Sequence, residues 1–251
     1  ARSIERLQDD PAVGRIDVVY VCSNADIARQ NVKRLDVIGR QHAVTSRLTL
    51  LARGAHRLDG EPVAAGKAVN LVSFTPGTLP GNGWATGTLE ERALIHVILR
   101  DHLGLDSADE RSSMLFFQGT VAKRGTVENK VWWTREEAER NGGIESTIAE
   151  DFVKLARQGG LLNAYRQCLA ETRGRRTQLP DAVKAQAASL ISRFRTDLAR
   201  ASVAALEPDL IILDEFQRFR DLLVPDTDTE AADLARSLFG AARILHALFA
   251  R

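Results

Sequence analysis

The most restrictive feature of the sequence is a short apolar run that ends abruptly in two acidic residues. The run is Leu210–Leu213, with Pro208 and Asp209 before it and Asp214 and Glu215 after it. A short apolar segment between such residues is typical of a buried strand in a parallel sheet. The acids would then lie at the carboxyl end of the strand, where open α/β sheets place their ligands.

Two adjacent carboxylates at this place suit nucleotide hydrolysis. In nucleotide hydrolases of the P-loop class, an Asp at the end of such a strand holds the magnesium of ATP, and Asp214 occupies that position. Glu215 can orient and deprotonate the attacking water. The alternative is an ordinary surface turn after a strand, where acidic residues are common.

Two earlier segments also predict a strand that leads into a polar turn. Residues 16–21 are rich in β-formers, and Ser23 and Asn24 follow them before a predicted helix over 25–35. A strand over 68–74 leads into a turn with the sequence Thr-Pro-Gly-Thr. Hydroxyls and free backbone N–H groups are suitable donors to phosphate, although Pro-Gly is also a general turn sequence. A further strand is predicted over residues 48–51.

From residue 88 onward the pattern becomes helical. Thr88 and Glu91 form a capping-box pattern, and Gly104 predicts the end of that helix. Residues 105–131 are predicted to be less regular, and Thr134 to cap a helix over 135–140. More helices are predicted at 148–159, at 161–169 and from Asp181 onward. We therefore expect a mostly helical insertion over 88–205, between sheet-forming parts at 1–87 and 206–251.

Composition narrows the class of protein. The chain has 251 residues, of which 44% are hydrophobic and 27% charged, as in ordinary globular domains. The net charge of +1 predicts no overall attraction to nucleic acid, so binding would need a local basic patch. Cys22 and Cys168 are expected to be buried thiols in a reducing compartment. Without a long apolar segment or a signal-peptide pattern, we expect a cytoplasmic protein without a membrane partner.

The order of these motifs resembles the first RecA-like lobe of superfamily-2 helicases and translocases, with the closest likeness to bacterial relatives of the Swi/Snf type. Asp214-Glu215-Phe216-Gln217 looks like motif II, the Walker B box. Residues 19–31 look like motif Ia and its helix, and residues 75–78 look like motif Ib. The resemblance covers roughly residues 15–80 and 205–251 and implies a RecA-like α/β fold with a parallel sheet.

The resemblance implies roles for individual residues and two cofactors, ATP and Mg²⁺. Asp214 would bind the magnesium ion through water, and Glu215 would act as the base for the attacking water. Gln217, where many relatives have His, would couple the nucleotide site to the nucleic-acid site. Contacts to the nucleic-acid backbone, with DNA favoured over RNA, would come from Ser23, Asn24, Thr75, Gly77 and Thr78.

The sequence departs from the family pattern in two ways. It contains no Gly-x-x-x-x-Gly-Lys-Ser/Thr loop and no Ser-Ala-Thr motif after motif II. We therefore expect a piece of a longer helicase-like protein, which would not hydrolyse ATP at a useful rate in isolation. A second hypothesis is a non-catalytic RecA-like interaction module that binds a protein partner through its helical block. A third is a different α/β nucleotide binder in which Asp214 and Glu215 hold a metal.

The three tryptophans allow two interpretations. Trp84, Trp132 and Trp133 could stack on bases. We favour the alternative, in which they are packing anchors of the inserted helical block.

Overall fold

The structure is a computed structural model of the chain, and its description covers part of the sequence. The described residues are 6–7, 9–11, 16–22, 42–45, 47–53, 69–75, 86–119, 121, 123–140, 142–174, 179–206, 208–214, 233 and 236. The chain divides into two compact units. The sheet unit comprises 1–51, 55–82 and 202–251, and the helical unit comprises 52–54 and 83–201.

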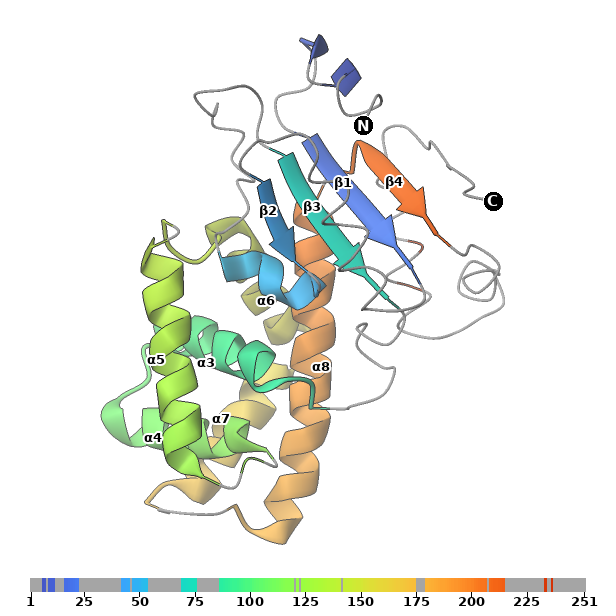
Figure 1. Cartoon of the computed structure of the whole chain (residues 1–251). Coiled ribbons are helices and arrows are strands. Elements are labelled where there is room, and N and C mark those ends of the chain that lie inside the picture. Colours follow the sequence, from blue (N-terminus) through green and yellow to red (C-terminus); the bar gives the residue numbers. More distant parts are fainter. Residues whose placement is uncertain are drawn as a thin grey trace. The chain divides into compact units, whose positions relative to one another are not determined.

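In its described residues, the sheet unit contains four strands that all run in the same direction (Figure 1). Their order across the sheet is β2-β3-β1-β4. The chain therefore leaves β1 toward one side for β2 and β3, and later returns to the other side of β1 for β4. The strands are β1 (Ile16–Val21), β2 (His42–Thr45), β3 (Val69–Phe74) and β4 (Leu210–Leu213).

Strand β1 forms the centre of this sheet and is buried along its whole length. Apolar side chains on one of its faces join those of its neighbours in a hydrophobic cluster. Apart from Asp17, the strand consists of apolar residues and Tyr20, which suits a strand of a parallel sheet whose two faces are covered. The buried members of the cluster are Ile16, Val18, Tyr20, Cys22, Val69, Leu71 and Leu210.

The helical unit consists of α-helices joined by short connections (Figure 1). Most of the last helix belongs to this unit. The helices are α3 (Leu89–Leu103), α4 (Ser107–Gln118), α5 (Arg124–Arg140), α6 (Ser146–Gln158), α7 (Leu161–Thr172) and α8 (Asp181–Ala205). The described residues thus combine a parallel sheet with a mostly helical block, which is compatible with the predicted α/β class.

Aromatic side chains fill the core of the helical unit. Phe116 lies 5.0 Å from Tyr165 between ring centroids, in an edge-to-face arrangement. Tyr165 in turn lies 5.7 Å from Phe194 of α8, with the ring planes at 90°. Edge-to-face pairs place the positive ring edge against the negative ring face, which favours this packing beyond simple burial. These contacts connect α4, α7 and α8.

Local signals predicted several elements correctly. Thr88 caps α3, with its hydroxyl accepting from the N–H of Glu91 and the Glu91 side chain accepting from the N–H of Thr88. Gly104 ends this helix in the left-handed conformation, with φ 58°. The strands predicted at 16–21, 68–74 and 210–213 are present as β1, β3 and β4. Both cysteines are buried free thiols, as predicted.

Three predictions of secondary structure were wrong. Residues 48–51 belong to a 3-10 helix, Leu48–Arg53, and the strand of this region is β2, which precedes it. Residues 105–131, predicted to be irregular, contain all of α4 and the first half of α5. Thr134 does not cap a helix, because it lies inside α5 and its hydroxyl donates to the carbonyl of Lys130 at 2.9 Å. The helix predicted over 25–35 lies outside the described residues.

None of the helices in the described part of the chain combines the length and the apolarity needed to cross a membrane.

Candidate functional site

The carboxyl ends of β1, β3 and β4 meet at one edge of the sheet because the strands are parallel. Val21 is in register with Phe74 on one side and with Leu213 on the other. The residues that follow, Thr75 and Asp214, are therefore at the same level on opposite sides of β1. With about 4.8 Å between neighbouring strands, their backbones lie about 10 Å apart.

At this edge, the connections that leave the strands do not all run in the same direction across the sheet. The connections after β1 lead to β2 and β3 on one side, whereas β4 lies on the other side. In open parallel sheets, ligands bind outside the carboxyl ends of the strands at such a reversal. The connections that leave β1 and β3 run in opposite directions, so the reversal lies between these two strands, and Asp214 lies beside the end of β1 at the same edge of the sheet.

Two hydrogen bonds from β1 hold Asp214. Its backbone N–H donates to the carbonyl of Val21 at 2.9 Å, which extends the pairing of β4 by one residue. The hydroxyl of Tyr20 donates to Oδ2 of the Asp214 carboxylate. Both the backbone and the side chain of Asp214 are thus positioned by the neighbouring strand, and the carboxyl group remains only partly buried.

The other predicted site residues can be placed only in part. Thr75 follows β3 and is buried, with 4% of its surface exposed, so its side chain offers little surface to a phosphate. Six predicted residues lie outside the described part of the chain. They are Ser23, Asn24, Gly77, Thr78, Glu215 and Gln217.

Sequence analysis missed Tyr20 as a site residue. The alternating pattern of β1 indicates which face it occupies, since Ile16, Val18 and Cys22 share that face. Tyr20 is the one member of this set with a hydroxyl group. The partner of that hydroxyl depends on the order of strands in the sheet, which the strand sequences do not specify.

A second pair of acids lies at the opposite, amino end of the strands. The backbone N–H of Asp17 donates to Oδ2 of Asp209 at 2.9 Å, and the N–H of Asp209 donates to the carbonyl of Asp17 at the same distance. The buried Asp17 carboxylate accepts from Nδ2 of Asn70 at 2.8 Å. These contacts join the starts of β1, β3 and β4, and they give Asp17 and Asp209 a structural role in the sheet.

The described residues fit a magnesium ion that is held mainly by water and by substrate oxygens. Mg²⁺ prefers oxygen ligands and is commonly bound through one or two carboxylates plus phosphates, with several waters retained. Asp214 supplies one such carboxylate. Among the described residues, no group of three or more His, Cys, Asp or Glu side chains could hold a metal ion, so a site built entirely from protein ligands is not found there.

The helical unit contains a buried chain of three polar side chains. Oγ of Ser113 lies 2.6 Å from Nδ1 of His96 and accepts a hydrogen bond of 2.5 Å from the hydroxyl of Tyr165. A serine next to a histidine can form a nucleophile–base pair, but all three residues are 0% exposed. A substrate therefore cannot reach them, and they serve as polar packing of α3, α4 and α7.

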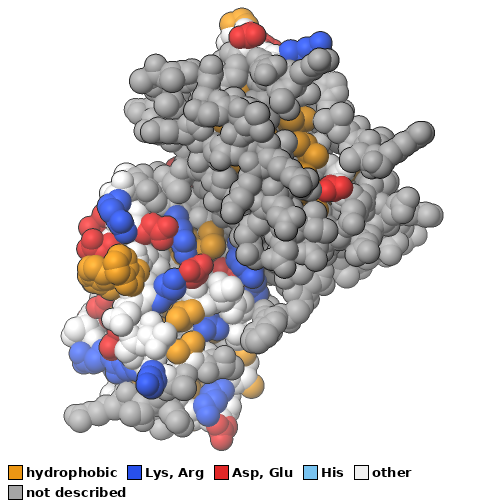
Figure 2. Space-filling view, viewed as in Figure 1, with side chains coloured by type: hydrophobic (Ala, Val, Ile, Leu, Met, Phe, Trp, Pro, Cys, Tyr) orange, Lys and Arg blue, Asp and Glu red, His pale blue; other side chains and the backbone are white. Residues whose placement is uncertain are grey.

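The surface of the helical unit shows charges of both signs. In Figure 2 the blue and red side chains are interspersed over the visible described part of this unit. Such mixing does not produce the single-sign surface that attracts nucleic acid.

Trp132 and Trp133, predicted to be packing anchors, are 53% and 55% exposed, so that prediction was wrong for both. They pack on each other, with ring centroids 4.7 Å apart. Trp84 lies outside the described residues.

Comparisons with family models, with curated proteins and with solved structures gave no match for this chain.

Proposed function

We propose that this chain supplies the Walker B part of the nucleotide site of an ATP-dependent helicase or translocase that moves on nucleic acid, with DNA favoured over RNA. The observation that carries the proposal is the position of Asp214, at the carboxyl end of β4 and beside the end of β1, where the connections that leave β1 and β3 run in opposite directions. In this proposal the sheet unit belongs to a RecA-like lobe. The order of sequence motifs supports the same assignment.

Each residue has a defined task in the proposed reaction. When bound, Mg·ATP supplies the γ-phosphate that is transferred to water, and the ion neutralises charge on its oxygens. Asp214 would bind the waters of the ion through its carboxylate. Glu215 would accept the proton of the attacking water. Gln217 would connect this site with the nucleic-acid contacts at Ser23, Asn24, Gly77 and Thr78.

The phosphate-binding loop of the site lies outside these 251 residues in this proposal. Without that loop, the site lacks the contacts that its Lys and backbone N–H groups make to the β- and γ-phosphates. We therefore expect the 251-residue chain alone to hydrolyse ATP far more slowly than the full gene product.

The test is ATP hydrolysis by the full gene product, with and without DNA. DNA should stimulate hydrolysis, and Glu215→Gln should abolish it because the base for the attacking water is lost. Glu150→Gln, at an exposed position of α6, makes the same chemical change and should leave the rate unchanged. A folded protein with no hydrolysis under either condition would contradict the proposal.

One observation favours a second candidate function, a non-catalytic interaction module. The exposed tryptophan pair on α5 is the kind of surface that protein interfaces use, because large aromatic side chains gain most from burial there. This candidate predicts no ATP hydrolysis. It also predicts that Trp132→Ser weakens association with a protein partner without unfolding the chain.

A further inference from the structure

The hydroxyl of Tyr20 is directed from the interior of the sheet unit to the candidate site. The Tyr20 side chain is 4% exposed and belongs to the hydrophobic cluster of β1, β3 and β4. Its register partner in β4 is Ile212, two residues before Asp214. From this position its hydroxyl reaches Oδ2 of Asp214, at the carboxyl end of the sheet.

A buried tyrosine hydroxyl needs a hydrogen-bond partner, because a polar group without one loses the bonds that it makes in water. Here the partner is the carboxylate that we place at the metal. An ionised carboxylate has about four acceptor positions on its two oxygens. The bond from Tyr20 therefore fixes the orientation of the carboxylate without using all of its acceptor positions.

We propose that Tyr20 is a positioning residue of the nucleotide site, which holds the carboxylate of Asp214 in the orientation that binds the waters of Mg²⁺. This inference rests on the proposed function. The bond from Tyr20 Oη sets the side-chain orientation of Asp214, and the bond to Val21 sets its backbone. Residues that orient a metal-binding carboxylate typically contribute 10–100-fold to metal affinity.

The experiment measures binding of Mn²⁺, which reports on Mg²⁺ sites by electron paramagnetic resonance. It uses the full gene product with a non-hydrolysable ATP analogue bound. Tyr20→Phe retains the ring, so the hydrophobic cluster stays filled and only the hydroxyl is lost. The dissociation constant for Mn²⁺ should rise by about tenfold.

The chain offers a matched control. Tyr165 is the other tyrosine of the chain, it is equally buried, and its hydroxyl donates to Ser113 in the helical unit. Tyr165→Phe therefore makes the same chemical change away from the site. It should lower thermal stability and leave Mn²⁺ affinity unchanged. If Tyr20→Phe behaves in the same way, Tyr20 has only a structural role and the inference is wrong.

Asp214→Asn separates failure of the inference from failure of the proposed function. Loss of Mn²⁺ affinity in Asp214→Asn but not in Tyr20→Phe would overturn the role of Tyr20 alone. Unchanged affinity in folded Asp214→Asn would overturn the nucleotide-site assignment as well. Loss of affinity in both variants, with the Tyr165→Phe control unchanged, is the expected result.

Discussion

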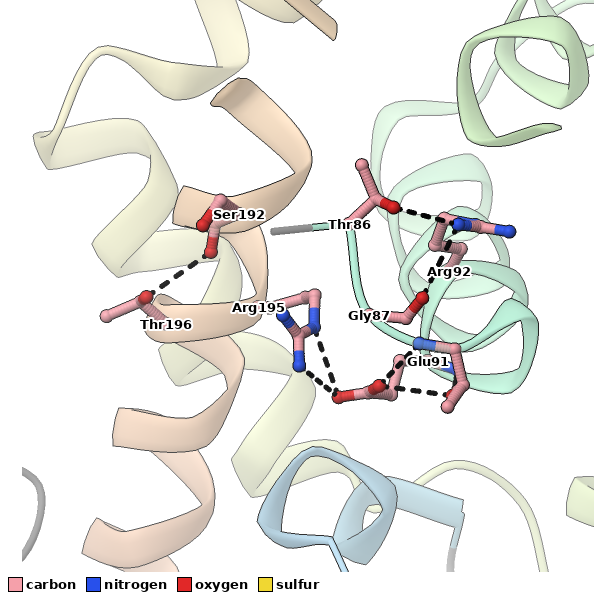
Figure 3. Close-up of polar contacts among 8 residues, drawn as sticks. Thr86, Gly87, Glu91, Arg92, Ser192, Arg195 and Thr196 are labelled. Atoms are coloured by element: carbon pink, nitrogen blue, oxygen red, sulfur yellow. Dashed lines mark hydrogen bonds and ion pairs between the residues drawn. The ribbon is translucent and has the colours of Figure 1, made fainter. Parts of the chain in front are cut away.

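Arg195 and Glu91 form an ion pair inside the helical unit, with Nη2 of Arg195 3.0 Å from Oε1 of Glu91 (Figure 3). Their side chains are 3% and 0% exposed. The second carboxylate oxygen of Glu91 accepts from the backbone N–H of Thr88 at 2.8 Å and from its hydroxyl at 3.1 Å. One carboxylate thus caps α3 and also neutralises a buried cation of α8.

Glu91→Gln should destabilise the helical unit by about 3–5 kcal/mol, because it removes the carboxylate that faces the buried cation of Arg195. Arg92 adds to the effect, since it is also buried and its contacts are with neutral groups of Thr86, Gly87 and Gln118. Burial lowers the pKa of Arg92, Glu91 raises it, and Arg195 lowers it. The measurement is the free energy of unfolding in urea.

The control for Glu91→Gln is Glu150→Gln at the exposed position of α6. That variant should change the free energy of unfolding by less than about 0.5 kcal/mol. Equal effects of the two substitutions would show that the buried pair makes no special contribution to stability.

Gly87→Ala should destabilise the protein for two reasons. Gly87 has φ +62°, a conformation that side chains disfavour, and a Cβ there would lie 2.2 Å from Nε of Arg195. The new methyl group would displace Arg195 from Glu91. Gly104 has a similar φ of +58°, but a Cβ there would have nothing within 4 Å. Gly104→Ala therefore measures the cost of the backbone conformation alone. Gly104→Ala should cost about 1 kcal/mol and Gly87→Ala clearly more. Equal costs would contradict the contact with Arg195.

Stability should fall in acid because of His96. Burial lowers its pKa to about 3, and the cations of Arg100 and Arg135 add to the effect. The unfolded chain binds a proton at this group below its ordinary pKa of about 6.5, whereas the folded chain does not. The contribution of neutral His96 to the free energy of unfolding is therefore complete above pH 6.5. It decreases by about 1.4 kcal/mol per pH unit as the pH falls toward 3.

This pH dependence can be measured by comparing the unfolding free energy of the parent protein with that of His96→Gln at several pH values. The advantage of the parent protein should decrease as the pH falls through this window. His102→Gln removes an exposed histidine of the same helix and serves as the control. A difference between parent and His96→Gln that stays constant from pH 7 to 4 would argue against this account.

Trp132→Gln should have little effect on stability because more than half of the side chain is already exposed. We expect a change of less than about 0.5 kcal/mol in the free energy of unfolding. Phe116→Ala, in the buried aromatic core, should cost about 3–5 kcal/mol. A large loss for Trp132→Gln would restore the packing role that the sequence suggested.

The elements that sequence analysis predicted correctly depend on interactions between near neighbours in the chain. The capping box of α3 joins residues three positions apart, and Gly104 ends the helix through its own backbone conformation. The apolar run of β4 marks a buried strand whatever its neighbours are. The errors arose where contacts with residues distant in the sequence determine the secondary structure. Strand β2 exists because it pairs with β3, and Thr134 lies within a helix because Val127, Val131 and Ala138 of α5 are buried with it.

The same distinction applies to the candidate site. Strand propensity and breaking residues act locally, so the order of the residues alone places two acids after a buried strand and a polar turn after another strand. The folded structure was needed to show that β4 lies beside β1, that Asp214 lies next to the end of the central strand, and that Tyr20 reaches its carboxylate. Pairing in a parallel sheet joins segments almost 200 residues apart here, and the hydrogen bonds that select the partner are made by backbone groups common to all residues.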